Sequence, residues 1–229
     1  MIDTLSKLKK ISEKKINLMA YSEIDEKKWK KGDISMLMSS DAPEFIKSII
    51  KHKKRKDSSR HLTMWYFGEA YVASKLASSV QEGWFCSFKW LHDPTWINGR
   101  NPDRENNKVI EALKRIFYNE ALMKYIGEDK LQDLQNRGRK KDQEGNTYKP
   151  KAPDLWLIDK NGKSHFIEIK KTDVRDEPSD EQLIGLAIIE KYLKCPVHLV
   201  LLYRADKNVP DDYKFAKHIK RFEKFKTIV

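Results

Sequence analysis

Two apolar segments separated by a short turn constrain the fold of this 229-residue chain more than any other feature. Residues 154–158 (Asp-Leu-Trp-Leu-Ile) and 164–170 (Ser-His-Phe-Ile-Glu-Ile-Lys) are rich in β-branched and aromatic side chains, which favour strands. Between them, Asp159, Asn161 and Gly162 occupy the first, third and fourth positions of a type I turn. With Gly162 in the left-handed conformation, the connection becomes a three-residue loop with a bulge. The sequence therefore predicts an antiparallel hairpin.

The loop length decides which side chains face each other. If Asp159 pairs with Lys163, counting back pairs Asp154 with Glu168, and directly opposed side chains have Cβ atoms roughly 5 Å apart. Lys170 projects from the same face as Glu168, because side chains alternate along a strand. Two carboxylates at this spacing can reach one divalent cation at about 2.1 Å. A two-residue turn would move Asp154 to the opposite face, so the predicted site depends on the odd-length loop.

These residues also have a purely structural interpretation. Asp154 can simply follow Pro153 where a strand begins, and Glu168 and Lys170 can form the solvated face of an edge strand. However, the strand is apolar on both sides, as expected of a central strand, where charged side chains need a specific role. We therefore predict that Asp154, Glu168 and Lys170 form a site.

The proline-preceded Asp154, the triplet Glu168-Ile169-Lys170 and the later Gln182 resemble the signature of the PD-(D/E)xK nuclease superfamily, and most closely its virus-type replication-repair branch (VRR-NUC). The resemblance implies a restriction-endonuclease-like α/β core, with a central mixed β-sheet flanked by helices. It also implies hydrolysis of DNA phosphodiester bonds with Mg²⁺ or Mn²⁺ as cofactor. By the same resemblance, the metal ligands are Asp154, Glu168 and the backbone carbonyl of Ile169. Lys170 is then the catalytic lysine, and Gln182 the glutamine that opens the next helix.

The family also tends to carry a glutamate on the helix before the first core strand, and Glu69 is the residue that would take this place beside the metal. Glu69 lies in an otherwise apolar stretch, so it is either a buried carboxylate with a role or an exposed helical glutamate. Gln182 has a structural alternative too. Residues 179–182 (Ser-Asp-Glu-Gln) read as a capping box in which Ser179 is the N-cap.

The rest of the chain divides into a basic N-terminal region and the predicted core. Residues 1–60 are Lys-rich with helical patterns over 2–19 and 41–50, which predicts a helical N-terminal extension. The core is expected over 61–229, with a helical and loop insertion over about 92–150. Its further predicted elements are a helix over 63–82 ended by Gly83, a strand over 84–91, a helix over 105–126 ended by Gly127, a turn-rich basic segment over 136–152, a helix over 180–194, a strand over 197–203 and a C-terminal helix.

The net charge of +12 and the isoelectric point near 9.4 suit a polyanionic partner such as DNA. Two basic segments, 51–56 and 136–141, are placed to contact phosphates. The residues predicted to do so are Lys53, Lys54, Arg55, Arg137, Arg139, Lys140 and Lys171. A solvated surface is the alternative for each segment, and the first equally suits a localisation signal in a eukaryote.

Other classes of protein are disfavoured. The two cysteines do not make a disulfide framework, and the six histidines lack zinc-ligand spacing. No run of eighteen apolar residues occurs, so we expect a soluble, intracellular protein without membrane contact, in the cytoplasm or nucleoid, or the nucleus in a eukaryote.

The sequence thus predicts a Mg²⁺- or Mn²⁺-dependent deoxyribonuclease that selects DNA structures in repair, replication or recombination. A restriction-type endonuclease stays open, with residues 1–60 and 92–150 supplying sequence recognition. A non-catalytic nucleic-acid-binding module with a nuclease-like core is the other alternative. A homodimer is compatible with either enzyme, because paired strand cuts need two sites.

Overall fold

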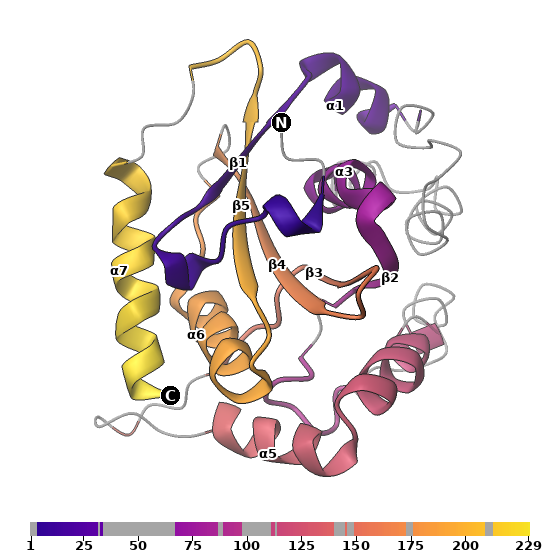
Figure 1. Cartoon of the computed structure of the whole chain (residues 1–229), viewed down its shortest axis with the longest axis vertical. Helices are drawn as coiled ribbons and strands as arrows, with labels where there is room; N and C mark the ends of the chain where they lie inside the picture. The colour runs from indigo at the N-terminus through magenta and orange to yellow at the C-terminus, as the bar shows by residue number, and fades with distance from the viewer. Residues whose placement is uncertain are drawn as a thin grey trace.

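A five-stranded mixed sheet organises the part of the chain that the structure describes (Figure 1). The computed structural model describes residues 4–31, 33, 67–86, 89–97, 111–112, 114–139, 145, 149–172, 176–208 and 213–229. The strands are β1 (Asn17–Tyr21), β2 (Val80–Phe85), β3 (Leu155–Asp159), β4 (Ser164–Lys171) and β5 (Val197–Arg204). Their order is β1-β5-β4-β3-β2, and the sheet is not closed. The predicted α/β class with a mixed sheet flanked by helices is confirmed.

The central strand β4 has neighbours of both orientations. It pairs antiparallel with β3 and parallel with β5, while β1 runs parallel to β5 and β2 antiparallel to β3. Strand β5 is buried on both faces along most of its length, which matches its continuous apolar sequence. The solvated-edge interpretation of Glu168 and Lys170 is therefore wrong, because β4 lies in the middle of the sheet.

Helices cover both faces of the sheet (Figure 1). On the first face, called the α3 face, lie α1 (Glu23–Lys30), α3 (Phe67–Leu76) and the 3₁₀ turn η1 (Leu5–Lys7). On the second, called the α6 face, lie α5 (Glu128–Gly138), α6 (Asp180–Ile188) and α7 (Tyr213–Ile228). Shorter helical elements are the 3₁₀ turns η2 (Ile11–Glu13) and η4 (Ala77–Ser79) and the π-helices η5 (Phe117–Met123) and η7 (Ile189–Leu193).

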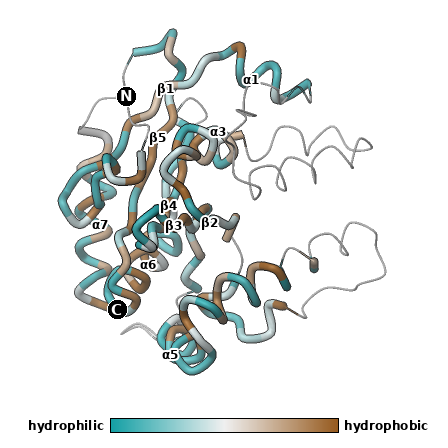
Figure 2. Tube along the Cα trace, turned by 45° about the vertical axis from the view of Figure 1, so that its right-hand side comes forward, coloured by the Kyte–Doolittle hydropathy of each residue, from teal (hydrophilic) through white to brown (hydrophobic). Residues whose placement is uncertain are grey.

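Side-chain alternation assigns each strand residue to one of these faces. On β4, Ile167 and Ile169 belong to the core under α3, whereas Phe166 belongs to the core under α6 and stacks on Trp156 of β3. Glu168 has the same parity as Phe166 and so projects toward α6. The hydropathy colouring in Figure 2 is brown along much of the sheet and teal along α1 and α5, as expected for outer helices.

The prediction of a helix over residues 2–19 is wrong. This segment forms the turns η1 and η2 and then the edge strand β1, whose Asn17 pairs with Val200 of β5. Residues 17–21 therefore belong to the core sheet and not to a separate helical extension. The predicted helix over 41–50 and the basic residues Lys53, Lys54, Arg55 and Lys140 lie outside the described residues.

Three predicted boundaries also need correction. Helix α3 ends at Leu76, and Gly83 lies inside β2 instead of ending the helix. The first core strand spans Val80–Phe85 rather than 84–91. The segment over 136–152 is not wholly turn-like, because α5 extends to Gly138. By contrast, Gly127 does end the preceding helical segment, with φ of 80°.

Among the described residues, no helix is both long enough and apolar enough to cross a membrane.

Candidate active site

The β3–β4 hairpin has the register that the sequence predicts. Asp159 N donates to Lys163 O at 2.9 Å, and Gly162 N donates to Asp159 O at 2.9 Å, with Gly162 at φ 78°. Leu155 pairs with Ile167, so the next position along the ladder places Asp154 opposite Glu168. The predicted three-residue loop is confirmed, and with it the alignment of the two carboxylates on the α6 face.

Asp154 lies directly before β3 and is held by its neighbours on both sides. Its Oδ2 accepts a hydrogen bond from Ile169 N at 2.9 Å, and its backbone O accepts one from Cys86 N at 3.0 Å. The Cys86 thiol also donates to Pro153 O at 3.1 Å. The residue as a whole is half-buried. The end of β2 therefore fixes the backbone that presents Asp154.

Glu168 is completely buried, at 0% exposure, and only one of its oxygens has a hydrogen-bond partner. Oε1 accepts from the Gln182 amide and lies 2.8 Å from Lys170 Nζ. Oε2 has no hydrogen-bond partner among the described residues. A buried carboxylate oxygen without a partner costs free energy, which is a reason to expect a ligand at this position.

Gln182 caps α6, as one of its two predicted roles requires, and its side chain also contacts Glu168. Its Oε1 accepts from Ser179 N at 3.0 Å, while Ser179 Oγ accepts from Gln182 N at 3.3 Å, which completes the capping box at the start of α6. Its amide nitrogen meanwhile donates to Glu168. The helix cap thus fixes the side chain that orients the buried glutamate.

Lys170 is 8% exposed and has a second acidic neighbour, Asp176, whose Oδ1 lies 3.5 Å from Nζ. The sequence prediction did not include Asp176. The only local signal was its place shortly before the capping box, in a connection that is rich in acidic residues. With Asp176, three carboxylates surround a single ammonium group.

This excess of negative charge shifts the protonation of the group. Burial raises the pKa of Asp154 to about 6, although the Lys170 ammonium acts in the opposite direction. Burial and the Asp154 carboxylate together raise the pKa of Glu168 well above its ordinary value. Burial alone would lower the pKa of Lys170, but the carboxylates of Glu168 and Asp154 raise it. Two carboxyls with raised pKa form an environment that favours a cation.

The residues present fit a hard divalent cation of the Mg²⁺ type. Mg²⁺ prefers oxygen ligands, takes one or two carboxylates and keeps several waters. Asp154 and Glu168 supply two carboxylates, and Oε2 of Glu168 has no hydrogen-bond partner within the described segments. No group of three or more His, Cys, Asp or Glu side chains suited to a metal occurs in the described part of the chain. A cation would therefore complete its coordination with water and backbone oxygens.

The remaining predicted site residues that the structure describes lie on α3, at the α3 face of β4, and on or just after α5. Glu69 is half-buried on α3, which packs against the opposite face of β4 at Ile169. Lys171 also points to the α3 face, where its amine lies 2.6 Å from Glu26 Oε1. Arg137 bonds to Asp133 at 2.8 Å, and Arg139 bonds to Asn136 at 2.7 Å, both within and just after α5. The proposed roles of these residues stay predictions.

Comparison of the chain with protein-family models, curated proteins and solved structures found no match.

Proposed function

We propose that the chain is a divalent-metal-dependent nuclease with a restriction-endonuclease-like core of the PD-(D/E)xK type. The observation that carries the proposal is the hairpin register, which aligns Asp154 with Glu168, together with a buried Glu168 oxygen that has no hydrogen-bond partner among the described residues. The Lys170 ammonium beside them completes the set of groups that phosphodiester hydrolysis needs. The α/β architecture with a mixed sheet is compatible with such a core.

In the proposed reaction each residue has a definite task. When bound, Mg²⁺ or Mn²⁺ supplies Lewis-acid polarisation of the phosphate and a water of lowered pKa. Asp154 and Glu168 hold the cation site, with the Ile169 carbonyl as the third proposed ligand. Lys170, kept protonated by the carboxylates, donates hydrogen bonds to the attacking water or to the phosphate, where negative charge develops. Gln182 holds the Glu168 carboxylate in place.

DNA is the proposed substrate, in accord with the net charge of +12. Because the uncompensated carboxylates repel phosphate, DNA should bind more tightly when a divalent cation is present. We propose structure-selective cleavage, inside the cell, in the cytoplasm or nucleoid, or in the nucleus of a eukaryote. A homodimer would bring together two active sites, one for each strand of the DNA.

The test compares wild type with Lys170→Ala, using Lys171→Ala as a matched control. Both lysines lie on β4, but Lys171 faces α3 and contacts Glu26 instead of the site. Plasmid, flap, four-way-junction, single-stranded and duplex DNA are incubated with Mg²⁺, Mn²⁺ or EDTA. We expect cleavage by wild type and by Lys171→Ala with metal, none in EDTA, and a loss of about 10²-fold or more in Lys170→Ala.

Cleavage in EDTA, or equal cleavage by wild type and Lys170→Ala, would refute this mechanism. Mn²⁺ binding without cleavage of any substrate would point to the non-catalytic binding module instead. Discrete fragments from plain duplex would indicate a restriction-type enzyme.

A further inference from the structure

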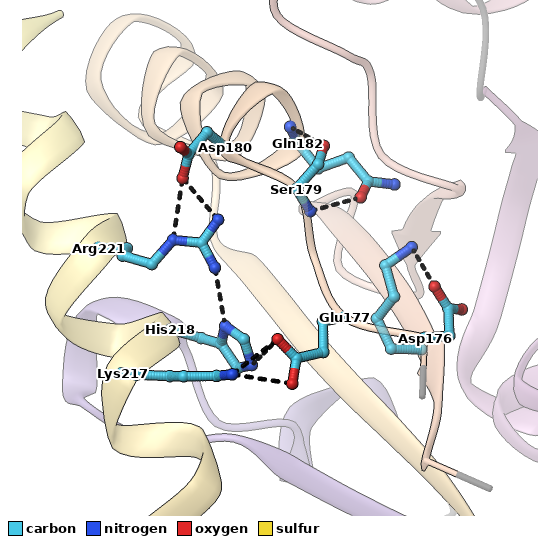
Figure 3. A network of polar contacts seen from close by, with 9 residues as sticks. Asp176, Glu177, Ser179, Asp180, Gln182, Lys217, His218 and Arg221 are labelled. Atoms are coloured by element: carbon cyan, nitrogen blue, oxygen red, sulfur yellow. Dashed lines mark hydrogen bonds and ion pairs between the residues drawn. The ribbon is translucent and has the colours of Figure 1, made fainter. Parts of the chain in front are cut away.

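The C-terminal helix α7 contacts the segment that runs from the site into α6, residues 176–182. Lys217 Nζ lies 2.8 and 2.7 Å from the two oxygens of Glu177. Arg221 donates through Nε to Asp180 Oδ1 at 2.9 Å, and its Nη2 contacts the same oxygen. Figure 3 shows these contacts on the α7 side of the segment. Two successive turns of α7 therefore bind two acidic residues of one short segment.

A buried histidine connects the two contacts. His218 is 2% exposed, and Arg221 Nη1 lies 3.2 Å from its Nδ1. A guanidinium can only donate, so Nδ1 is the acceptor and the ring proton is on Nε2, which lies 4.0 Å from Glu177 Oε2. Burial lowers the pKa of His218 and favours this neutral form; the Glu177 carboxylate opposes the effect, and the charges of Lys217 and Arg221 add to it. Lys217, His218 and Arg221 thus form one connected row.

The same segment contacts the proposed site through other residues. Asp176 lies beside Lys170, and Gln182 donates to Glu168 from within the capping box that Ser179 begins. Figure 3 shows the Ser179–Gln182 contacts and the aspartate–lysine contact on the side of the segment away from α7. Residues 176–182 therefore link α7 with the groups that orient Glu168 and Lys170.

We infer that α7 is a positioning element for the site and that Arg221 is its principal anchor. The inference rests on the proposed function. Arg221 is the residue of α7 that contacts both Asp180, in the first turn of α6, and His218. When Arg221 is lost, Asp180 and His218 lose their shared donor, and the N-terminus of α6 that carries Gln182 is free to shift. Groups that orient metal ligands through hydrogen bonds typically change metal affinity or activity by about 10-fold or more when they are removed.

The ion pairs themselves contribute little to global stability, because both members are substantially exposed. The side chains of Arg221 and Asp180 are 34% and 62% exposed, and exposed pairs of this kind are weak. A positioning role of Arg221 and a merely structural role can therefore be told apart by the quantities that its substitution changes. Positioning predicts lower kcat and weaker metal binding with an almost unchanged midpoint of urea unfolding.

The experiment uses the full chain with Arg221→Gln, Arg221→Lys and the control Lys226→Gln. Lys226 lies on the same helix and pairs at 2.8 Å with Glu190 of η7, so it anchors α7 without contacting residues 176–182. Three quantities are measured: amide hydrogen exchange of residues 176–182, Mn²⁺ affinity by calorimetry, and kcat and KM on the best substrate of the DNA panel.

For Arg221→Gln we expect faster exchange in this segment, with Mn²⁺ affinity and kcat each lower by about 10-fold. Arg221→Lys should recover part of each loss, and Lys226→Gln should behave as wild type. If Arg221→Gln keeps the wild-type Mn²⁺ affinity and kcat, or if Lys226→Gln shows equal losses, the inference about α7 is refuted while the proposed function stands. A wild-type protein that neither binds Mn²⁺ nor cleaves DNA would overturn the proposed function and this inference with it.

Discussion

The two faces of β4 carry charged side chains in very different surroundings. On the α3 face, the Lys171 ammonium lies 2.6 Å from Glu26 Oε1 and over the rings of Tyr21 and Phe67, at 5.1 and 5.7 Å. On the α6 face, Glu168 is fully buried, one of its oxygens has no hydrogen-bond partner in the part of the chain that the structure describes, and the carboxylate of Asp154 adjoins it. Glu168 and Lys171, three residues apart on one strand, thus lie in an environment with excess negative charge and in a compensated one, respectively.

We interpret this difference as one between charge that is satisfied within the fold and charge that a ligand would compensate. An ammonium between a carboxylate and aromatic ring faces is compensated by its neighbours, so no ligand is needed to explain it. Two neighbouring carboxylates with raised pKa cost stability, and natural proteins retain such a cost where binding or catalysis requires it. The α6 face is therefore the one where we place the site.

The closeness of helix packing gives the largest expected difference between the faces. A Cβ on Gly185 of α6 would lie 1.9 Å from the backbone O of Lys151, just before Asp154. A Cβ on Gly68 of α3 would lie 3.2 Å from the terminal methyls of Ile169 and Leu202, which can move. We expect Gly185→Ala to lower the free energy of unfolding by about 3 kcal/mol. Gly68→Ala should change it by less than about 1 kcal/mol, since alanine favours the helix.

Urea unfolding of both variants, with m-values checked against wild type, measures this difference. Equal destabilisation by the two substitutions would show that the faces do not differ in how closely their helices approach the sheet.

The parts of the fold that the sequence predicted are those that local signals determine. The turn at Asp159–Gly162 fixes the hairpin register, and Ser179 with Gln182 fixes the start of α6. The strand β1 was predicted as helix because its pairing partner, β5, lies far away in the sequence, as the pair Asn17 and Val200 illustrates. Pairing at such separation leaves no mark within the segment itself.

The candidate site shows the same division. Register alone predicts that Asp154, Glu168 and Lys170 share a face. Asp176 contacts Lys170, and Arg221 contacts Asp180 at the start of α6, only through tertiary packing, and nothing in their local sequence distinguishes them from other charged residues. Likewise, the end of α3 at Leu76 involves Ser79, whose hydroxyl donates to Leu76 O and accepts from Leu5 N of the distant N-terminal segment.

Acidification tests whether the α3 face tolerates a new charge. His198 of β5 is 1% exposed, with Nδ1 3.0 Å from Lys9 O and Nε2 3.1 Å from His165 Nδ1. Burial lowers the pKa of His198 to about 4, and the His165 and Lys10 charges add to this effect while Glu13 opposes it. A folded pKa below the unfolded value means that stability is lost as pH falls from about 6.5 toward 4.

We expect His198 to account for about 3 kcal/mol of the stability lost between pH 7 and pH 4. The measurement is the difference in pH-dependent urea unfolding between wild type and His198→Asn. Parallel pH profiles for the two proteins would mean that the α3 face accommodates the imidazolium.

The smallest expected effects come from removing one charge from each face of β4, and they change the free energy of unfolding in opposite directions. Without metal, Asp154→Asn should raise the free energy of unfolding by about 1 kcal/mol, because it removes a charge that repels Glu168. The new amide oxygen can still accept from Ile169 N. Lys171→Met should lower the free energy of unfolding by about 1 kcal/mol, because Glu26 loses one of its two lysine partners and the aromatic rings lose the ammonium.

Repeating the two unfolding measurements with Mn²⁺ shows whether the α6 face binds a cation. A cation that binds only the folded protein stabilises it in proportion to its affinity. Adding Mn²⁺ should therefore stabilise wild type and Lys171→Met alike, and should leave Asp154→Asn almost unchanged. If Mn²⁺ stabilises Asp154→Asn as much as wild type, the cation binds elsewhere, and the uncompensated charge of the α6 face needs another explanation than a metal site.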